Sequence, residues 1–501
     1  MAVACSPHHT LAVTQEGHAL GSAGDITSML GMTYLASRLR ARLVMVSCGR
    51  EHEAYLDCCG ELWTSGHGDR GQLGNGALEG RVKPTRLRRC RFGGVRVKMV
   101  ACGGWHTLAV TDLDIVWAFG AGCFGQLGTG DEFDRSEPAE VASLRCARIV
   151  FVAAGCAHST AVSAEGRLFT WGDGSCGKLG HGNRDKQLLP RKVASGCFGH
   201  CSVVQTAAGA NHTAAVTVEG LLYTFGLNCS GQLGQGDETT RLLPTLVPAT
   251  ACGGPVLMVA CGADHTLAVT QRGSVMATGE GYHAQLGLGD LQRRVAFERV
   301  PMPQLDGAKI ATVSAGYSHS AAVSEDGALL TWGRSRAHGN PTVRAPATEG
   351  MGVRHRGAWE SDRPYPVGYD DVLHTLQPTL VELGNMGTRI GRCRALPREH
   401  ALAFAMVTHP RLGRAQTVMA GKAAGEQSVF AGLVEHLVEM VVVGACREWP
   451  EGAAGQEEGV VRLLGGGLML GSATRPLELP ADSPHFEEVC EDSSRDEEAE
   501  W

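Results

Sequence analysis

Two phrases decide how this chain folds: Ala101-Cys-Gly-Gly-Trp-His-Thr-Leu-Ala-Val-Thr111 and Tyr223-Thr-Phe-Gly-Leu-Asn-Cys-Ser-Gly-Gln-Leu-Gly234. The first contains a small residue and a glycine, followed three residues after that glycine by histidine. This pattern recurs at intervals of 54, 52, 54, 53 and 54 residues, with its histidines at His52, His106, His158, His212, His265 and His319. Nineteen residues after the histidine, Gly-Gln-Leu-Gly or a close variant begins at Gly71, Gly125, Gly177 and Gly231. Motifs at a fixed offset identify tandem repeats of about 53 residues.

Each repeat predicts four short β-strands. Apolar runs such as residues 106–111 and 167–172 are bounded by glycine turns, and the pairs Glu165-Gly166 and Asp326-Gly327 are typical of hairpins. Four short strands make one blade of a β-propeller, which buries its faces only against its neighbours. We therefore expect an all-β, seven-bladed propeller over residues 1–413, with residues 400–413 forming closure strands or the stub of an eighth blade.

Two repeats depart from the common length. The first, from His9 to His52, has 43 residues and lacks about ten after Gly31. In the seventh, Pro378-Thr-Leu-Val matches Pro244-Thr-Leu-Val of an earlier repeat only if 27 residues are inserted within residues 337–377. Long loops on rigid scaffolds often carry function. This insertion contains residue types that anchor protein interfaces, namely Arg354, Arg356, Trp359 and Arg363. An insertion without a binding role remains the alternative.

The recurring histidines do not indicate a metal site. One histidine per blade would be spread around a ring instead of converging on one ion. We expect each to bond backbone inside its own blade. Gly-Gln-Leu-Gly lacks the Gly-Lys-Ser/Thr ending of a phosphate loop. The histidines and the glycines of the two motifs are thus interpreted as structural, with no metal, cofactor or catalytic group.

Composition limits the classes of function. The 501 residues carry a net charge of −7 and only 19% charged residues, which provides no general attraction to nucleic acid or anionic membranes. The N-terminus has no basic region followed by an apolar stretch, and no uncharged apolar run reaches 18 residues. Without a secretory signal, the 18 cysteines should be mostly reduced, as in the cytoplasm or nucleus.

The C-terminal part of the sequence lies outside the repeats. Val429, Leu433, Leu437 and Val441 are four residues apart and predict one helix over residues 425–447. We expect residues 414–480 to form a small helical cap or docking segment. Residues 481–501 are rich in aspartate and glutamate and are predicted to be an acidic, disordered tail.

The two phrases resemble regulator of chromosome condensation repeats, and the resemblance covers roughly residues 1–413. It implies a seven-bladed propeller that binds proteins through loops on its faces. Known members include an exchange factor for the GTPase Ran, scaffolds, ubiquitin-ligase modules and a plant UV-B receptor. Two departures matter. The segment Gly120–Gly128 carries no insertion where the exchange factor has its wedge-like loop, and only Trp105 stands beside the histidine phrase, where the UV-B receptor clusters tryptophans.

We expect a non-enzymatic scaffold that binds partner proteins through propeller-face loops. The alternative is a guanine-nucleotide exchange factor for a small Ran-like GTPase, which would need an acidic or wedge-like loop. A third hypothesis is a propeller that plugs a partner's active site with one face. None of these requires a cofactor, a membrane or direct contact with nucleic acid.

Overall fold

A computed structural model describes residues 2–7, 10–14, 17–21, 41–305, 307–335 and 373–380. By its contacts the chain divides into residues 1–425 and residues 426–501, and every described residue belongs to the first unit. The described residues form β-strands and short 3-10 helices and contain no α-helix.

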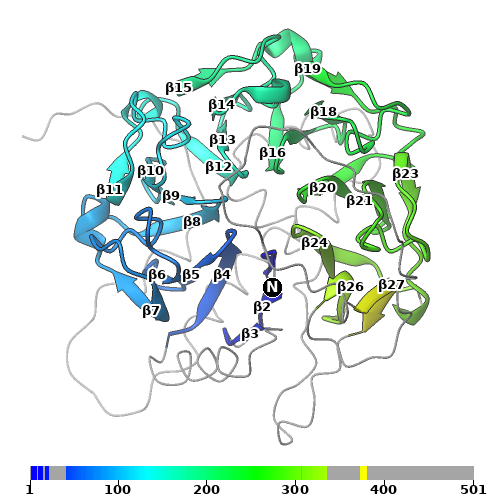
Figure 1. Cartoon of the computed structure of the whole chain (residues 1–501), viewed down its shortest axis with the longest axis horizontal. Coiled ribbons are helices and arrows are strands. Elements are labelled where there is room, and N and C mark those ends of the chain that lie inside the picture. The colour runs from blue at the N-terminus through cyan, green and yellow to red at the C-terminus, as the bar shows by residue number, and fades with distance from the viewer. Residues whose placement is uncertain are drawn as a thin grey trace, which may run out of the picture. The chain divides into compact units, whose positions relative to one another are not determined.

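Six antiparallel sheets have four strands each, in chain order from the axis outward (Figure 1). The first three blades are β4 (Leu43–Cys48), β5 (His52–Asp57), β6 (Leu62–Gly66) and β7 (Arg81–Leu87); β8 (Val97–Cys102), β9 (His106–Thr111), β10 (Val116–Gly120) and β11 (Arg135–Glu140); and β12 (Ile149–Ala154), β13 (His158–Ser163), β14 (Leu168–Gly172) and β15 (Gln187–Lys192). The next three are β16 (Val203–Ala208), β17 (His212–Thr217), β18 (Leu222–Gly226) and β19 (Arg241–Leu246); β20 (Val256–Cys261), β21 (His265–Thr270), β22 (Val275–Gly279) and β23 (Arg294–Arg299); and β24 (Ile310–Ala315), β25 (His319–Ser324), β26 (Leu329–Ser335) and β27 (Leu373–Leu380).

Five 3-10 helices lie in the connections: η1 (Arg89–Phe92), η2 (Ala142–Leu144), η3 (Ser175–Gly177), η4 (Ser195–Phe198) and η5 (Pro303–Leu305). Four of them, η1, η2, η4 and η5, follow the outer strand of a blade and lead to the next blade. The exception, η3, lies between β14 and β15.

A seventh, three-stranded sheet closes the ring. It consists of β1 (Val3–Cys5), β2 (Thr10–Val13) and β3 (Ala19–Gly21). The inner strands contact one another in the cyclic order β1, β4, β8, β12, β16, β20, β24 and back to β1. The amide of Cys5 donates to the Ser314 hydroxyl over 3.0 Å, and the amide of Leu43 donates to the Gly17 carbonyl over 3.0 Å. The N-terminal sheet therefore joins the last blade to the first.

The prediction of seven blades was wrong: the described residues form six complete blades. Residues 3–21 form three strands, and residues 22–40, the rest of the shortened first repeat, lie outside the described part. The predicted C-terminal helical segment is not supported either. The described part of the chain has no α-helix, and residues 414–480 and the predicted tail lie outside it. Nor is any helix of the described residues long and apolar enough to cross a bilayer.

Aromatic side chains fill the space between neighbouring blades. Trp171 is fully buried, and its indole N–H donates to the Gln126 carbonyl of the preceding blade over 2.9 Å. A methyl group on Gly128 would lie 2.8 Å from this ring, so the last glycine of the repeat motif leaves room for it. Phe119, Phe225 and Trp332 occupy the same position in other blades and are also buried. Burial of such large rings is the main apolar contribution to blade stacking.

The blades have two different ends. Since His52 pairs with Gly66 across β5 and β6, the loop before β5 and the loop after β6 lie at one end, called here the loop face. The turn between β5 and β6 and the connection from β7 to β8 lie at the opposite end, called here the turn face. The histidine phrases and the Gly-Gln-Leu-Gly loops of all blades share the loop face.

Candidate functional site

The repeated histidines link each blade to the next. His52 Nε2 lies 2.9 Å from the hydroxyl of Thr107 in the following blade, and that hydroxyl donates to the Gln72 carbonyl over 2.9 Å. Because the single hydroxyl proton goes to the carbonyl, the threonine oxygen accepts from Nε2–H. The same arrangement joins the following pairs: His106–Ser159, His158–Thr213, His212–Thr266 and His265–Ser320.

Burial keeps these histidines uncharged. Desolvation lowers the pKa of His52 and of His212 to about 4, and that of His106 and of His265 to about 3. The histidine partner differs from the prediction, since each Nε2 bonds a hydroxyl of the neighbouring blade and not backbone of its own. No cluster of three or more metal-ligating side chains occurs within the described residues.

The repeated glycines are needed for both conformation and contact. Gly71, Gly125, Gly177 and Gly231 have φ values of 80°, 72°, 76° and 78°, in the left-handed region. A methyl group on Gly71 would lie 2.6 Å from the Arg135 carbonyl on the outer strand of the next blade. A methyl group on Gly125 would lie 2.7 Å from the side chain of Leu188. A large side chain would be strained there and would press on the next blade, whereas the β20–β23 blade accepts the methyl group of Ala284 at this position with φ of 59°.

A buried ion pair replaces glutamine in the β12–β15 blade. Lys178 stands where other copies have glutamine, and only 1% of its side chain is exposed. Its ammonium lies 2.5 Å from the Asp173 carboxylate, 2.9 Å from the side-chain amide oxygen Oδ1 of Asn211 and 3.1 Å from the Ser175 hydroxyl. Burial alone would raise the pKa of Asp173, but the neighbouring ammonium outweighs it and lowers that pKa. In the sequence this ion pair is marked by the lysine at a motif position that is glutamine in the other four described copies.

Aromatic and arginine side chains are displayed on the loop face. All three aromatic residues among the exposed large hydrophobic side chains of the described part lie there, with exposed fractions of 71% for Phe133 and 58% each for Tyr282 and Tyr317. Nearer the axis, the Arg50 guanidinium stacks over the Trp105 ring, 5.3 Å from its centroid. Such residues dominate the binding energy of protein interfaces.

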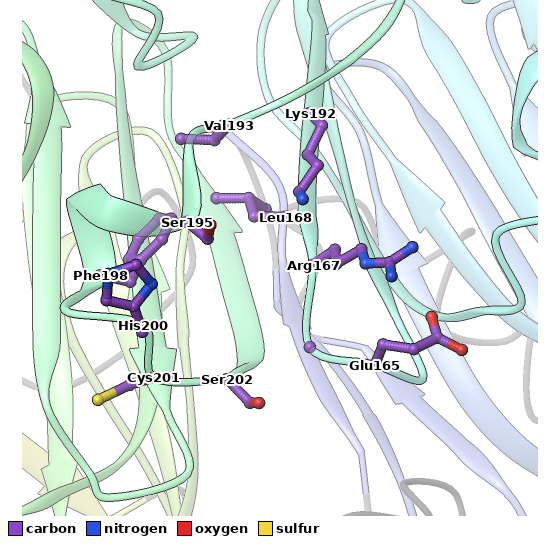
Figure 2. A pocket seen from close by; sticks show the side chains of 11 residues that line it. Glu165, Arg167, Leu168, Lys192, Val193, Ser195, Phe198, His200, Cys201 and Ser202 are labelled. Carbon is purple, nitrogen blue, oxygen red and sulfur yellow. The ribbon is translucent and has the colours of Figure 1, made fainter.

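A cavity of about 260 Å³ lies on the turn face between the β12–β15 and β16–β19 blades (Figure 2). One wall is the β13–β14 turn with the start of β14, from Glu165 to Leu168. The other is the end of β15 and the connection through η4, from Lys192 to Ser202. Figure 2 shows the Lys192 ammonium directed toward the middle of the lining residues, while Arg167 and Glu165 extend together to one side.

Comparison with known proteins agrees with this architecture. The family model described as "RCC1-like domain" matches residues 35–348. The chain belongs to the RCC1-like domain family. Its RCC1-like propeller is 36% identical over 293 residues to the Ultraviolet-B receptor UVR8 of Arabidopsis thaliana, which covers 58% of this chain and 65% of the receptor. It is 31% identical over 331 residues to the E3 ubiquitin-protein ligase HERC2 of Homo sapiens, covering 62% of this chain and 7% of the ligase. The chain thus spans less than two thirds of either protein.

Solved structures share the RCC1-like fold. Human WBSCR16 superposes with a TM-score of 0.58 at 26% identity, over 65% of this chain and 87% of that protein. Prp20p from Saccharomyces cerevisiae superposes with a TM-score of 0.55 at 22% identity, over 71% and 80% of the two chains. The latter likeness establishes the fold alone.

The predicted binding residues of the RCC1-like domain are not brought together by any described element. Arg354, Arg356, Trp359 and Arg363 all lie outside the described residues. What the structure does place is β27, the fourth strand of the sixth blade, in which Pro378 corresponds to Pro244 of β19. The repeat pattern gives no signal for the loop-face aromatics or for the residues of the turn-face cavity, because both sets stand at positions that vary between repeats.

Proposed function

We propose that this RCC1-like propeller is a non-enzymatic protein-binding module that engages its partner with the loop face. The observation that carries the proposal is that, within the described part of the chain, the large exposed aromatic side chains, Phe133, Tyr282 and Tyr317, all lie on that face. Tyrosine, tryptophan and arginine are enriched in interface centres, because their burial releases much energy at small cost in side-chain entropy. We place this activity in the cytoplasm or nucleus.

The rigidity of the ring supports this role. Each blade is tied to the next by a buried hydrogen-bonded histidine, so the loops of different blades are held at fixed positions. Interblade ion pairs on the loop face add to this, with Arg70–Asp134 at 3.4 Å and Lys186–Glu132 at 2.9 Å. A preorganised surface loses little conformational entropy on binding.

The identity of the partner is a separate question. Prp20p is described as binding Gsp1p and histones, and UVR8 as an ultraviolet-B receptor. Among the six described copies of the phrase, Trp105 is the one tryptophan directly before the histidine. We therefore favour a protein partner over light reception, with a small GTPase as the second candidate.

The test compares two triple variants of the full chain. Phe133→Ser, Tyr282→Ser and Tyr317→Ser together remove the loop-face aromatics. The control, Leu113→Ser, Leu189→Ser and Leu243→Ser, removes side chains exposed by 63%, 50% and 47% elsewhere. Immobilised wild-type protein captures partners, which are identified by mass spectrometry, purified and titrated against both variants. One capture is done in EDTA, which strips GTPases of magnesium and nucleotide.

We expect the loop-face variant to bind the purified partner at least tenfold more weakly and the control to bind within twofold of wild type. Equal binding by both variants would overturn the loop-face proposal. A GTPase that is captured in EDTA and released by GTP with Mg²⁺ identifies the second candidate.

A further inference from the structure

On the turn face of the β4–β7 blade, a small space lies between the β5–β6 turn and the connection that follows β7. We call this space the notch of the blade. Arg89, the first residue of η1, folds back onto that turn. Its guanidinium lies 2.6 Å from the Glu61 carboxylate and donates to the Cys59 carbonyl over 2.9 Å. A cation supplied by the chain itself therefore neutralises the acid at this turn.

The β12–β15 blade repeats the same backbone. Its connection Ser195-Gly-Cys-Phe198-Gly199 corresponds to Arg89-Cys-Arg-Phe92-Gly93. Both segments form a 3-10 helix that ends in a left-handed glycine, with φ of 57° at Gly199 and 66° at Gly93. Both buried phenylalanines pack edge-on against an aromatic ring of the next blade, Phe198 on Tyr223 and Phe92 on Trp117. The two notches can thus be compared residue by residue.

The notch of the β12–β15 blade differs from that of the β4–β7 blade at two positions, and these differences replace an ion pair by positive charge alone. Arg89 corresponds to Ser195, whose short side chain does not reach the turn, and Glu61 corresponds to Arg167. The result is the cavity of about 260 Å³, lined by Lys192 and Arg167 and by the hydroxyl-bearing Ser195 and Ser202. No ion pair to Lys192 or Arg167 is formed within the described residues.

The other blades show that this pair of cations is exceptional. In each of the other five described blades, at most one of the two residues that correspond to Arg167 and Lys192 is a cation. In chain order these pairs are Glu61/Arg86, Ile115/Glu140, Leu221/Leu246, Ser274/Arg299 and Ala328/Leu380. Among these six described blades, two cations occur together only here. Like charges beside one cavity repel each other, and a bound anion removes that repulsion.

We propose that this turn-face cavity binds a phosphoryl group, carried either by a phosphorylated side chain of a protein or by a small free phosphate. The Lys192 ammonium, the Ser195 hydroxyl and the His200 imidazole border one space, and a phosphoryl oxygen can accept a hydrogen bond from each of them; the Arg167 guanidinium lies at the edge of this space and adds positive charge. Glu165 also lines the cavity, but Figure 2 shows its carboxylate extending beside Arg167 and away from Ser195 and His200. The site goes beyond the proposed function, since it lies on the face opposite the loop face.

The experiment titrates the full chain with O-phosphoserine, inorganic phosphate, a phosphoserine peptide and, as the neutral reference, serine, by calorimetry at low ionic strength. Lys192→Gln removes the ammonium that points into the cavity. Arg191→Gln, its exposed neighbour outside the lining, is the matched loss of one positive charge. A third variant, Ser195→Arg with Arg167→Glu, rebuilds the Arg89–Glu61 ion pair of the β4–β7 blade, so that the new arginine side chain occupies the cavity.

We expect saturable binding of O-phosphoserine and none of serine. Lys192→Gln should weaken the binding at least tenfold and Arg191→Gln less than twofold. The double variant should lose binding while it melts no lower than wild type. A phosphopeptide that binds more tightly than inorganic phosphate identifies a protein source, and equal affinity identifies a free phosphate. Absence of saturable binding, or equal weakening by Lys192→Gln and Arg191→Gln, would overturn the proposal.

Discussion

His319 Nε2 lies 3.0 Å from the hydroxyl of Thr10, although 309 residues separate the two in the chain. This is the same contact that joins the other blades, here made between the last blade and the N-terminal sheet. A propeller gains the stability of its final interface only when its ends meet. Thr10 and His319 thus belong to the closure of the ring.

Thr10→Val should open this closure. It leaves the buried His319 without its hydroxyl acceptor, which costs about 1–3 kcal/mol of unfolding free energy. Thr10→Ser should stay close to wild type, because Ser159 and Ser320 make the same contact in other blades. Chemical denaturation of the three proteins measures the effect. Equal stability of the valine variant and wild type would show that the contact does not contribute.

Acid should unfold the propeller well above the pKa values of its buried histidines. In the unfolded chain these side chains bind a proton near pH 6.5, whereas burial lowers the pKa of His52 to about 4 and of His106 to about 3. Their contribution to stability is therefore complete above pH 6.5 and is lost as the pH falls toward 4. The loss is roughly 1.4 kcal/mol per pH unit for each histidine. Melting temperatures between pH 8 and pH 4.5 should drop steeply below pH 6; a flat profile would contradict this account.

Removing the lysine of the buried ion pair should be more harmful than removing the pair. Lys178→Met leaves the mostly buried Asp173 carboxylate without its cation and should cost about 3–5 kcal/mol. The double variant Lys178→Gln with Asp173→Asn, which restores the glutamine of the other copies, should recover most of the loss. Thermal melts of both proteins provide the measurement. If the single variant melted at the same temperature as the double variant, the ion pair would not be the cause.

Phe297 compensates for a missing aromatic in the β20–β23 blade. The position held by Trp171 or Phe225 elsewhere is Thr278 here, and the Phe297 ring from the outer strand lies against Gly234 instead. Phe297→Ala should cost about 3–5 kcal/mol. The exposed Phe133→Ala should change stability by less than about 0.5 kcal/mol. Denaturant midpoints of the two variants measure both effects. Equal midpoints would show that the Phe297 ring does not stabilise the contact between the blades.

The repeat frame was visible in the sequence because a blade imposes the same backbone on every copy. Gly71 and its equivalents must adopt positive φ next to the following blade, so the same residue returns at a fixed spacing. The propeller class and the family followed from that spacing. The number of complete blades did not, since the shortened first repeat still carries the marker phrase while its described residues form a sheet of three strands.

The sequence by itself determined that a blade has four short strands, that the blades follow one another in tandem, and which positions recur in each repeat. Those features depend on local conformation and on contacts at constant separation. Only the tertiary structure decided which hydroxyl each histidine bonds, how Thr10 meets His319, and that Ser195 and Arg167 leave a cation-lined cavity where Arg89 and Glu61 form an ion pair. These features depend on side chains that different strands and blades bring together. A periodic sequence pattern does not predict such contacts, because it describes only the residues that recur in its copies.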